Sequence, residues 1–148
     1  MTLDFRKSMF ARAAACAAVL SLAVGASQVA AHGDVTPQAV DVSTLKPLGE
    51  EWRETNPYRG DKAEALRIGS SAYNQNCARC HGLEVISGGI APDLRYLPTG
   101  DEGDEIFMMR IRNGAVRGGR VYMTPFEGIL PQEAMWAIRT YVESVHEE

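Results

Sequence analysis

The sequence lacks several features that would assign it to other large protein classes. No apolar run of 18 or more residues continues into the flanks of a membrane anchor, so we expect no permanent membrane span. Internal repeats are missing, as are clusters of Lys and Arg of the kind that bind nucleic acid. With 148 residues, 45% of them hydrophobic and 23% charged, and a net charge of −4, the chain fits one ordinary globular domain.

Cysteine is scarce as well, and one of the three cysteines lies in a segment that we expect to be removed. Positive charges between residues 6 and 12 precede the apolar stretch 13–26, which contains Cys16, and small residues follow up to Ala31. This order is typical of a secretory signal peptide. The sequence therefore predicts a signal peptide at residues 1–31, cleavage after Ala31 and export to the periplasm.

The other two cysteines lie next to a histidine, in the segment NQNCARCHG at residues 74–82. A structural zinc site needs four ligands, usually in two pairs, and Cys77, Cys80 and His81 have no second pair. A thioredoxin-type dithiol lies between a strand and a helix, and the sequence shows no such strand. A disulfide between the two cysteines would close too small a loop to stabilise much. Covalent haem attachment is the remaining chemistry, and it uses all three residues.

The Cys-x-x-Cys-His spacing is the signature of c-type haem attachment. Both thiols bond to the haem vinyl groups, and the adjacent His81 then lies beneath the iron as an axial ligand. In bacteria this attachment takes place outside the cytoplasm, which agrees with the predicted signal peptide. We therefore expect one covalently bound haem c, held by Cys77, Cys80 and His81.

Apolar periodicity predicts three helices in a domain that spans residues 61–148. Their expected ranges are 61–76, 99–114 and 131–145. Asp61 and Thr99 are the expected N-caps of the first two, and Pro131 fits the first position of the third. The acidic residues 101–105 suit the positive end of the second helix, with a calcium site as the alternative.

The remaining segments show turn formers rather than strand alternation. We expect loops at 82–98 and 115–129, and an N-terminal arm at 32–60 that Trp52 and Tyr58 anchor on the core. Three helices with long loops bury little apolar surface by themselves, so the chain needs something large to pack around. The sequence therefore predicts an all-α fold built around the haem.

The second axial ligand decides what the iron can do. The candidates are Met108, Met109, Met123, Met135, His32 and His146. Three of these methionines lie on predicted helices, where Met usually packs in the core, whereas Met123 lies in a loop that can aim its thioether. We therefore expect His81 and Met123 as iron ligands. Two protein ligands leave no open position for substrate, so the expected function is one-electron transfer and not catalysis.

These positions resemble those of the class I cytochromes c, over residues 61–145. The matching residues are Gly69, Tyr73, Cys77, Cys80, His81, Pro92, Met123 and Tyr141. The resemblance implies the cytochrome c fold, in which the final helix with Tyr141 packs across the first helix. It also implies that the Pro92 carbonyl accepts a hydrogen bond from the ligating His81.

A narrower resemblance is to the soluble periplasmic cytochromes c that accept electrons from PQQ-dependent ethanol dehydrogenase. It rests on the segments 32–41, 48–59, 73–84, 121–128 and 132–138. It implies a monomeric carrier between a periplasmic PQQ-dependent alcohol dehydrogenase and a terminal oxidase or other cytochrome. Two alternatives remain, a haem enzyme of the peroxidase or reductase type and a haem-based ligand sensor. Both need an open or labile sixth position on the iron.

Overall fold

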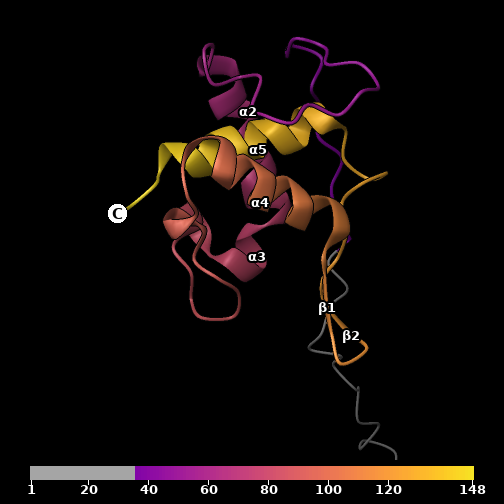
Figure 1. The fold of residues 1–148 in the computed structure, drawn as a ribbon, viewed down its shortest axis with the longest axis vertical. Coiled ribbons are helices and arrows are strands. Elements are labelled where there is room, and N and C mark those ends of the chain that lie inside the picture. The colour runs from indigo at the N-terminus through magenta and orange to yellow at the C-terminus, as the bar shows by residue number, and fades with distance from the viewer. Residues whose placement is uncertain (1–35) are drawn as a thin grey trace, which may run out of the picture. The chain divides into compact units, whose positions relative to one another are not determined.

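The computed structural model describes residues 36–148, so the predicted signal peptide and His32 lie outside the described residues. Within this range the chain forms helices α2 (Ala63–Asn76), α3 (Ala78–His81), α4 (Gly100–Asn113) and α5 (Gln132–Ser144). Short 3-10 helices lie at η1 (Leu83–Val85) and η2 (Leu94–Tyr96), and a hairpin joins β1 (Ala115–Arg117) to β2 (Arg120–Met123). Figure 1 shows this hairpin extending away from the helices. None of the helices in the described part has the length and apolar character to cross a membrane.

The core is built where α5 crosses α2. A Cβ atom added to Gly69 on α2 would lie 1.9 Å from the carbonyl oxygen of Ala137 on α5, so only glycine allows the two backbones to approach this closely. One turn further along, the rings of Tyr73 and Tyr141 pack with their centroids 5.5 Å apart. The expected crossing of the first and last helices is confirmed.

Residues 36–60 pack against α5 and bury the side of that helix that would otherwise face solvent. The Gln132 side-chain amide donates to the carbonyl oxygens of Gly49 and Glu51 at 2.6 and 3.0 Å. Asn56 is hydrogen-bonded to Thr140 at 3.0 Å, and Trp136 is completely buried. Since α5 is covered on both sides, it buries more residues than a single amphipathic face would contain.

The two aromatic residues expected to anchor the arm make different contacts. Tyr58 is buried, and its hydroxyl donates to the carbonyl oxygen of Lys46 at 2.9 Å. Trp52 is half-buried beneath the guanidinium of Arg112, whose carbon lies 4.1 Å from the ring centroid. Both residues therefore attach the arm, one by burial and the other by a cation–π contact.

Two of the three predicted helix starts are wrong. The N-cap of α2 is Lys62 and not Asp61, and no side chain caps that end. Pro131 is the N-cap of α5 instead of its first residue. Thr99 is the N-cap residue of α4, as predicted, although its side chain makes no capping hydrogen bond. These helix ends depend on tertiary packing more than on capping side chains.

The all-α prediction holds for the core, but the prediction of a loop at 115–129 is wrong at its start. An antiparallel hairpin forms there, with Arg117 paired to Arg120. The two loop residues, Gly118 and Gly119, have φ angles of 55° and 76°. Both values lie in the left-handed region that a two-residue hairpin turn requires, and glycine adopts it without strain. The Gly-Gly pair was therefore a readable hairpin signal.

Candidate functional site

The three residues of the Cys-x-x-Cys-His motif lie on a single helical turn. Cys77 ends α2 and begins α3, and its carbonyl oxygen accepts hydrogen bonds from the backbone N–H groups of Cys80 at 3.1 Å and His81 at 3.0 Å. Both cysteines are free and no disulfide joins them. Burial raises the pKa of the Cys77 thiol to about 12, with a smaller effect from Cys80. The turn thus presents two unpaired thiols beside one imidazole.

The imidazole of His81 is oriented by Pro92, eleven residues further along the chain. Its Nδ1 lies 2.8 Å from the carbonyl oxygen of Pro92. Because a carbonyl can only accept, Nδ1 carries the proton and the lone pair of the neutral ring is on Nε2. This is the tautomer that a metal-ligating histidine needs, with its other nitrogen held by a protein acceptor.

The chain turns back sharply directly after His81. Gly82 has a φ of 84°, and a Cβ atom there would lie 1.8 Å from the carbonyl oxygen of Ile86. The Tyr73 hydroxyl donates to the Gly82 carbonyl at 2.9 Å, which ties the turn to α2. Glu84 and Val85 also have positive φ values, and the complete burial of Val85 holds this strained conformation in place.

Met123 comes from a different part of the chain, the end of β2. It is half-buried and packs against the core. Met108 and Met135 are buried in α4 and α5, as expected for helical methionines, whereas Met109 is 53% exposed and its expected core role is wrong. The structure thus brings Cys77, Cys80, His81 and Pro92 together, and places Met123 on a separate segment.

Two of the acidic residues at the start of α4, Asp101 and Asp104, have arginine partners. Asp101 and Asp104 pair with Arg59 at 3.1 and 2.6 Å, and Asp104 also pairs with Arg139. No group of three or more His, Cys, Asp and Glu side chains in residues 36–148 could hold a metal ion. These carboxylates therefore join the arm to the helices, and they offer no support for a calcium site.

Sequence reasoning missed Arg95 and Glu147, which form an ion pair beside the loop that carries Pro92. Arg95 also pairs with Asp93, and its guanidinium lowers the pKa of that carboxyl to about 2. No local signal marks the pair with Glu147, because the two residues lie 52 positions apart.

Comparison with known proteins agrees with the fold and the motif. The model of the family described as "Cytochrome C oxidase, cbb3-type, subunit III" matches residues 64–142. The chain therefore belongs to the class I c-type cytochromes, which carry covalently bound haem c and transfer electrons instead of catalysing a reaction. Cytochrome c550 of Pseudomonas aeruginosa is 66% identical over 119 residues, which cover 78% of this chain and 82% of that protein. One Cys-x-x-Cys-His motif fits a single haem.

Two further relatives are much longer proteins from Pseudomonas putida. Quinohemoprotein alcohol dehydrogenase ADH IIB is 36% identical over 81 residues, which cover 55% of this chain and 11% of the enzyme. Quinohemoprotein alcohol dehydrogenase ADH-IIG is 34% identical over 65 residues, which cover 44% of this chain and 8% of the enzyme. No solved structure matches the chain significantly.

The residues around His81 fit a covalently attached haem. Two free thiols and an imidazole with its lone pair on Nε2 lie on one turn, and the second ring nitrogen is already engaged by Pro92. Exposed apolar side chains follow in the same segment, at Leu83 and Ile86. This donor set supplies what covalent attachment and axial ligation of a haem require.

Proposed function

We propose that this chain is a periplasmic monohaem cytochrome that accepts electrons from a quinoprotein alcohol dehydrogenase and passes them towards a terminal oxidase or another cytochrome. The observation that carries the electron-transfer role is the geometry of His81, with Nδ1 bonded to Pro92 beside two free thiols. The alcohol dehydrogenase is proposed as the donor because two quinohemoprotein alcohol dehydrogenases each contain a segment related to this chain.

Each site residue has a distinct role in this proposal. Cys77 and Cys80 would hold the haem by thioether bonds, and Nε2 of His81 would bind its iron. Met123, on β2, would be the second protein ligand of the iron, where its thioether would favour a high reduction potential. When bound, the haem supplies a centre that takes up and releases one electron. The hydrogen bond from Nδ1 to the Pro92 carbonyl would keep the His81 ring in one orientation towards the haem.

The donor is tested by mixing the oxidised holoprotein with a purified PQQ-dependent alcohol dehydrogenase and its alcohol. We expect the reduced absorption bands to appear only when enzyme, PQQ and alcohol are all present. A nicotinamide-dependent alcohol dehydrogenase with the same alcohol is the control, and it should give no reduction. Lack of reduction by every quinoprotein dehydrogenase tried would contradict the proposed donor but leave the electron-transfer role intact.

The proposed location has its own test. The protein recovered from the periplasmic fraction should begin at His32, which follows the predicted cleavage position. An uncleaved N-terminus, or recovery with the cytoplasmic fraction, would contradict export with cleavage after Ala31.

A further inference from the structure

Arg95 fastens the C-terminal tail to the loop that carries Pro92. Its Nη1 lies 2.6 Å from Oε1 of Glu147, while Nη2 and Nε bind the two carboxylate oxygens of Asp93 at 2.8 and 3.1 Å. The backbone N–H of Glu147 donates in turn to the carbonyl oxygen of Arg95 at 3.0 Å. The side chain of Arg95 is only 16% exposed, so these bonds are partly protected from water. We name the Asp93, Arg95 and Glu147 group the C-terminal clip.

Asp93 extends the clip into the loop itself. One of its oxygens accepts a hydrogen bond from the backbone N–H of Ser87 at 3.2 Å, and the other accepts from the N–H of Arg95 at 3.0 Å. The Ser87 hydroxyl donates to the Ala91 carbonyl. These bonds surround Pro92, whose carbonyl belongs to the peptide group that joins it to Asp93. The direction of that carbonyl therefore depends on how firmly Asp93 is held.

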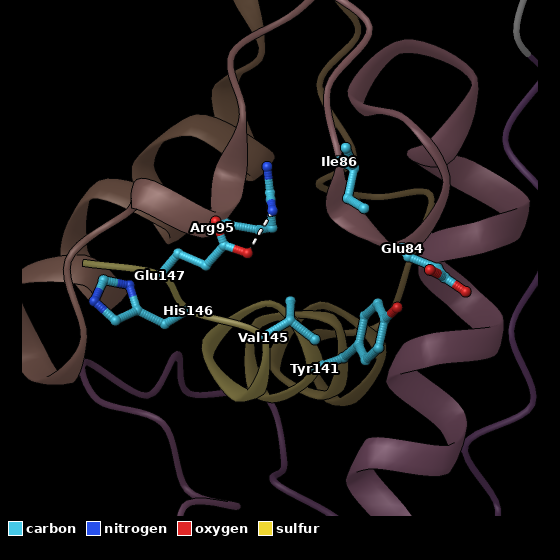
Figure 2. Close-up of a pocket in the computed structure, with 7 residues that line it drawn as sticks. All are labelled: Glu84, Ile86, Arg95, Tyr141, Val145, His146 and Glu147. Carbon is cyan, nitrogen blue, oxygen red and sulfur yellow. Dashed lines mark hydrogen bonds and ion pairs between the residues drawn. The ribbon is translucent and has the colours of Figure 1, made fainter.

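The clip has an open side. Arg95 and Glu147 border a hollow of about 460 Å³. Figure 2 shows Glu84 and Tyr141 on its opposite side, and Val145, which follows α5, between the two sides. Because side chains do not fill this space, few packing contacts can replace the ionic bonds if they are lost. Glu147 is also half exposed, and apart from Arg95 its side chain is held only by a long hydrogen bond of 3.5 Å from the Tyr96 hydroxyl.

We propose that Arg95 is a positioning residue for His81, and that Glu147 of the C-terminal tail completes this function. The clip fixes Asp93, Asp93 fixes the Pro92 carbonyl, and that carbonyl fixes the ring of His81. Hydrogen bonding at Nδ1 sets both the orientation and the basicity of a ligating imidazole. The proposal rests on the proposed ligation of the haem by His81, and adds that residues outside the motif control it.

The test uses the holoprotein and measures solvent exchange of the His81 Nδ1 proton by NMR, together with the reduction potential. In Glu147→Gln we expect exchange to be about fivefold faster, the size expected from loss of a partly exposed ion pair. Arg95→Gln should have a larger effect because it also releases Asp93. The exchange rate in Arg95→Lys should lie between those of Glu147→Gln and Arg95→Gln, since Lys keeps the charge but cannot bind Asp93 through two nitrogens. The potential should change in the same order.

Glu127→Gln is the matched control. It breaks the bidentate pair of Glu127 with Arg112, with both contacts at 3.0 Å, on a segment that does not hold Pro92. Exchange and potential in this variant should equal those of the wild type. If Arg95→Gln and Glu147→Gln behave like Glu127→Gln, the positioning role is wrong. If the wild type itself shows no iron-bound His81, the proposed ligation fails, and this outcome is distinct from failure of the clip.

Discussion

Arg139 on α5 and Asp104 on α4 form an ion pair 2.8 Å long in which neither side chain has exposed surface. The second oxygen of Asp104 accepts hydrogen bonds from the backbone N–H of Asn56 at 2.7 Å and from Arg59 at 2.6 Å. One carboxylate therefore joins two helices and the N-terminal arm. A buried charge is tolerated when it is paired and hydrogen-bonded in this way.

We expect Asp104→Asn to lower the free energy of unfolding by about 3–5 kcal/mol, because it removes the buried counter-charge of Arg139 and leaves only the longer 3.6 Å pair with Glu143. Urea unfolding of the holoprotein measures the change. Asp101→Asn is the control on the same helix, since Asp101 also pairs with Arg59 but its side chain is 74% exposed. It should cost less than about 1 kcal/mol. Equal effects of the two variants would contradict the importance of burial.

Gly69→Ala should lower the free energy of unfolding by about 1–3 kcal/mol, the usual effect of overpacking. The added methyl group would clash with the Ala137 carbonyl, and a backbone atom of α5 cannot move aside as a flexible side chain can. Gly60→Ala is the control, because no atom lies within 4 Å of a Cβ at that position. The same urea titration compares both. A neutral Gly69→Ala would show that the helices can separate without cost.

Replacing both cysteines, in Cys77→Ala/Cys80→Ala, should abolish covalent haem. The two thiols are the only cysteine side chains in residues 36–148, so no other thioether can form there. Haem staining of denaturing gels checks this, with colour expected to migrate with the wild-type chain alone. Wild-type colour that extracts into acidified organic solvent would contradict covalent attachment.

Met123→Ala should remove the weak far-red sulfur-to-iron charge-transfer band of the oxidised protein. Carbon monoxide or cyanide should then bind, because the sixth position is no longer occupied by a thioether. Met109→Ala is the control, since Met109 is exposed on α4 and its loss creates no cavity. If the wild type already binds these ligands readily, a labile sixth position and a sensor-like role become the better interpretation.

The arginines of the β1–β2 hairpin should steer the electron donor. Arg117 and Arg120 are exposed, and neither forms a salt bridge within residues 36–148. We expect Arg117→Glu/Arg120→Glu to slow second-order reduction by the quinoprotein dehydrogenase, and the wild-type rate to fall as salt rises.

The control for this experiment reverses two exposed charges elsewhere, in Lys46→Glu/Lys62→Glu. It changes the net charge by the same amount, so it separates a local effect of the hairpin from a general one. Equal slowing in both double variants would indicate net-charge steering alone. An unchanged rate and salt slope in the hairpin variant would show that the donor docks elsewhere.

The parts of this protein that were predictable are those in which the chemistry depends on near neighbours in the sequence. Cys77, Cys80 and His81 lie on one turn because residues three and four apart share a helix face. The same periodicity placed Tyr73 and Tyr141 on the inner faces of their helices. The Gly118-Gly119 turn was equally local, and its hairpin could have been read from the sequence.

The sequence by itself determined the attachment motif, the approximate helices and the class of cytochrome. Only the tertiary structure decided which charges meet. Asp104 and Arg139 are 35 residues apart and Arg95 and Glu147 are 52 apart, so no periodicity relates them. A buried charge needs a partner on the element that packs against it, and the whole fold decides which element that is. The contact of the arm with α5 was equally beyond prediction, because Asn56 and Thr140, which are hydrogen-bonded to each other, lie 84 residues apart.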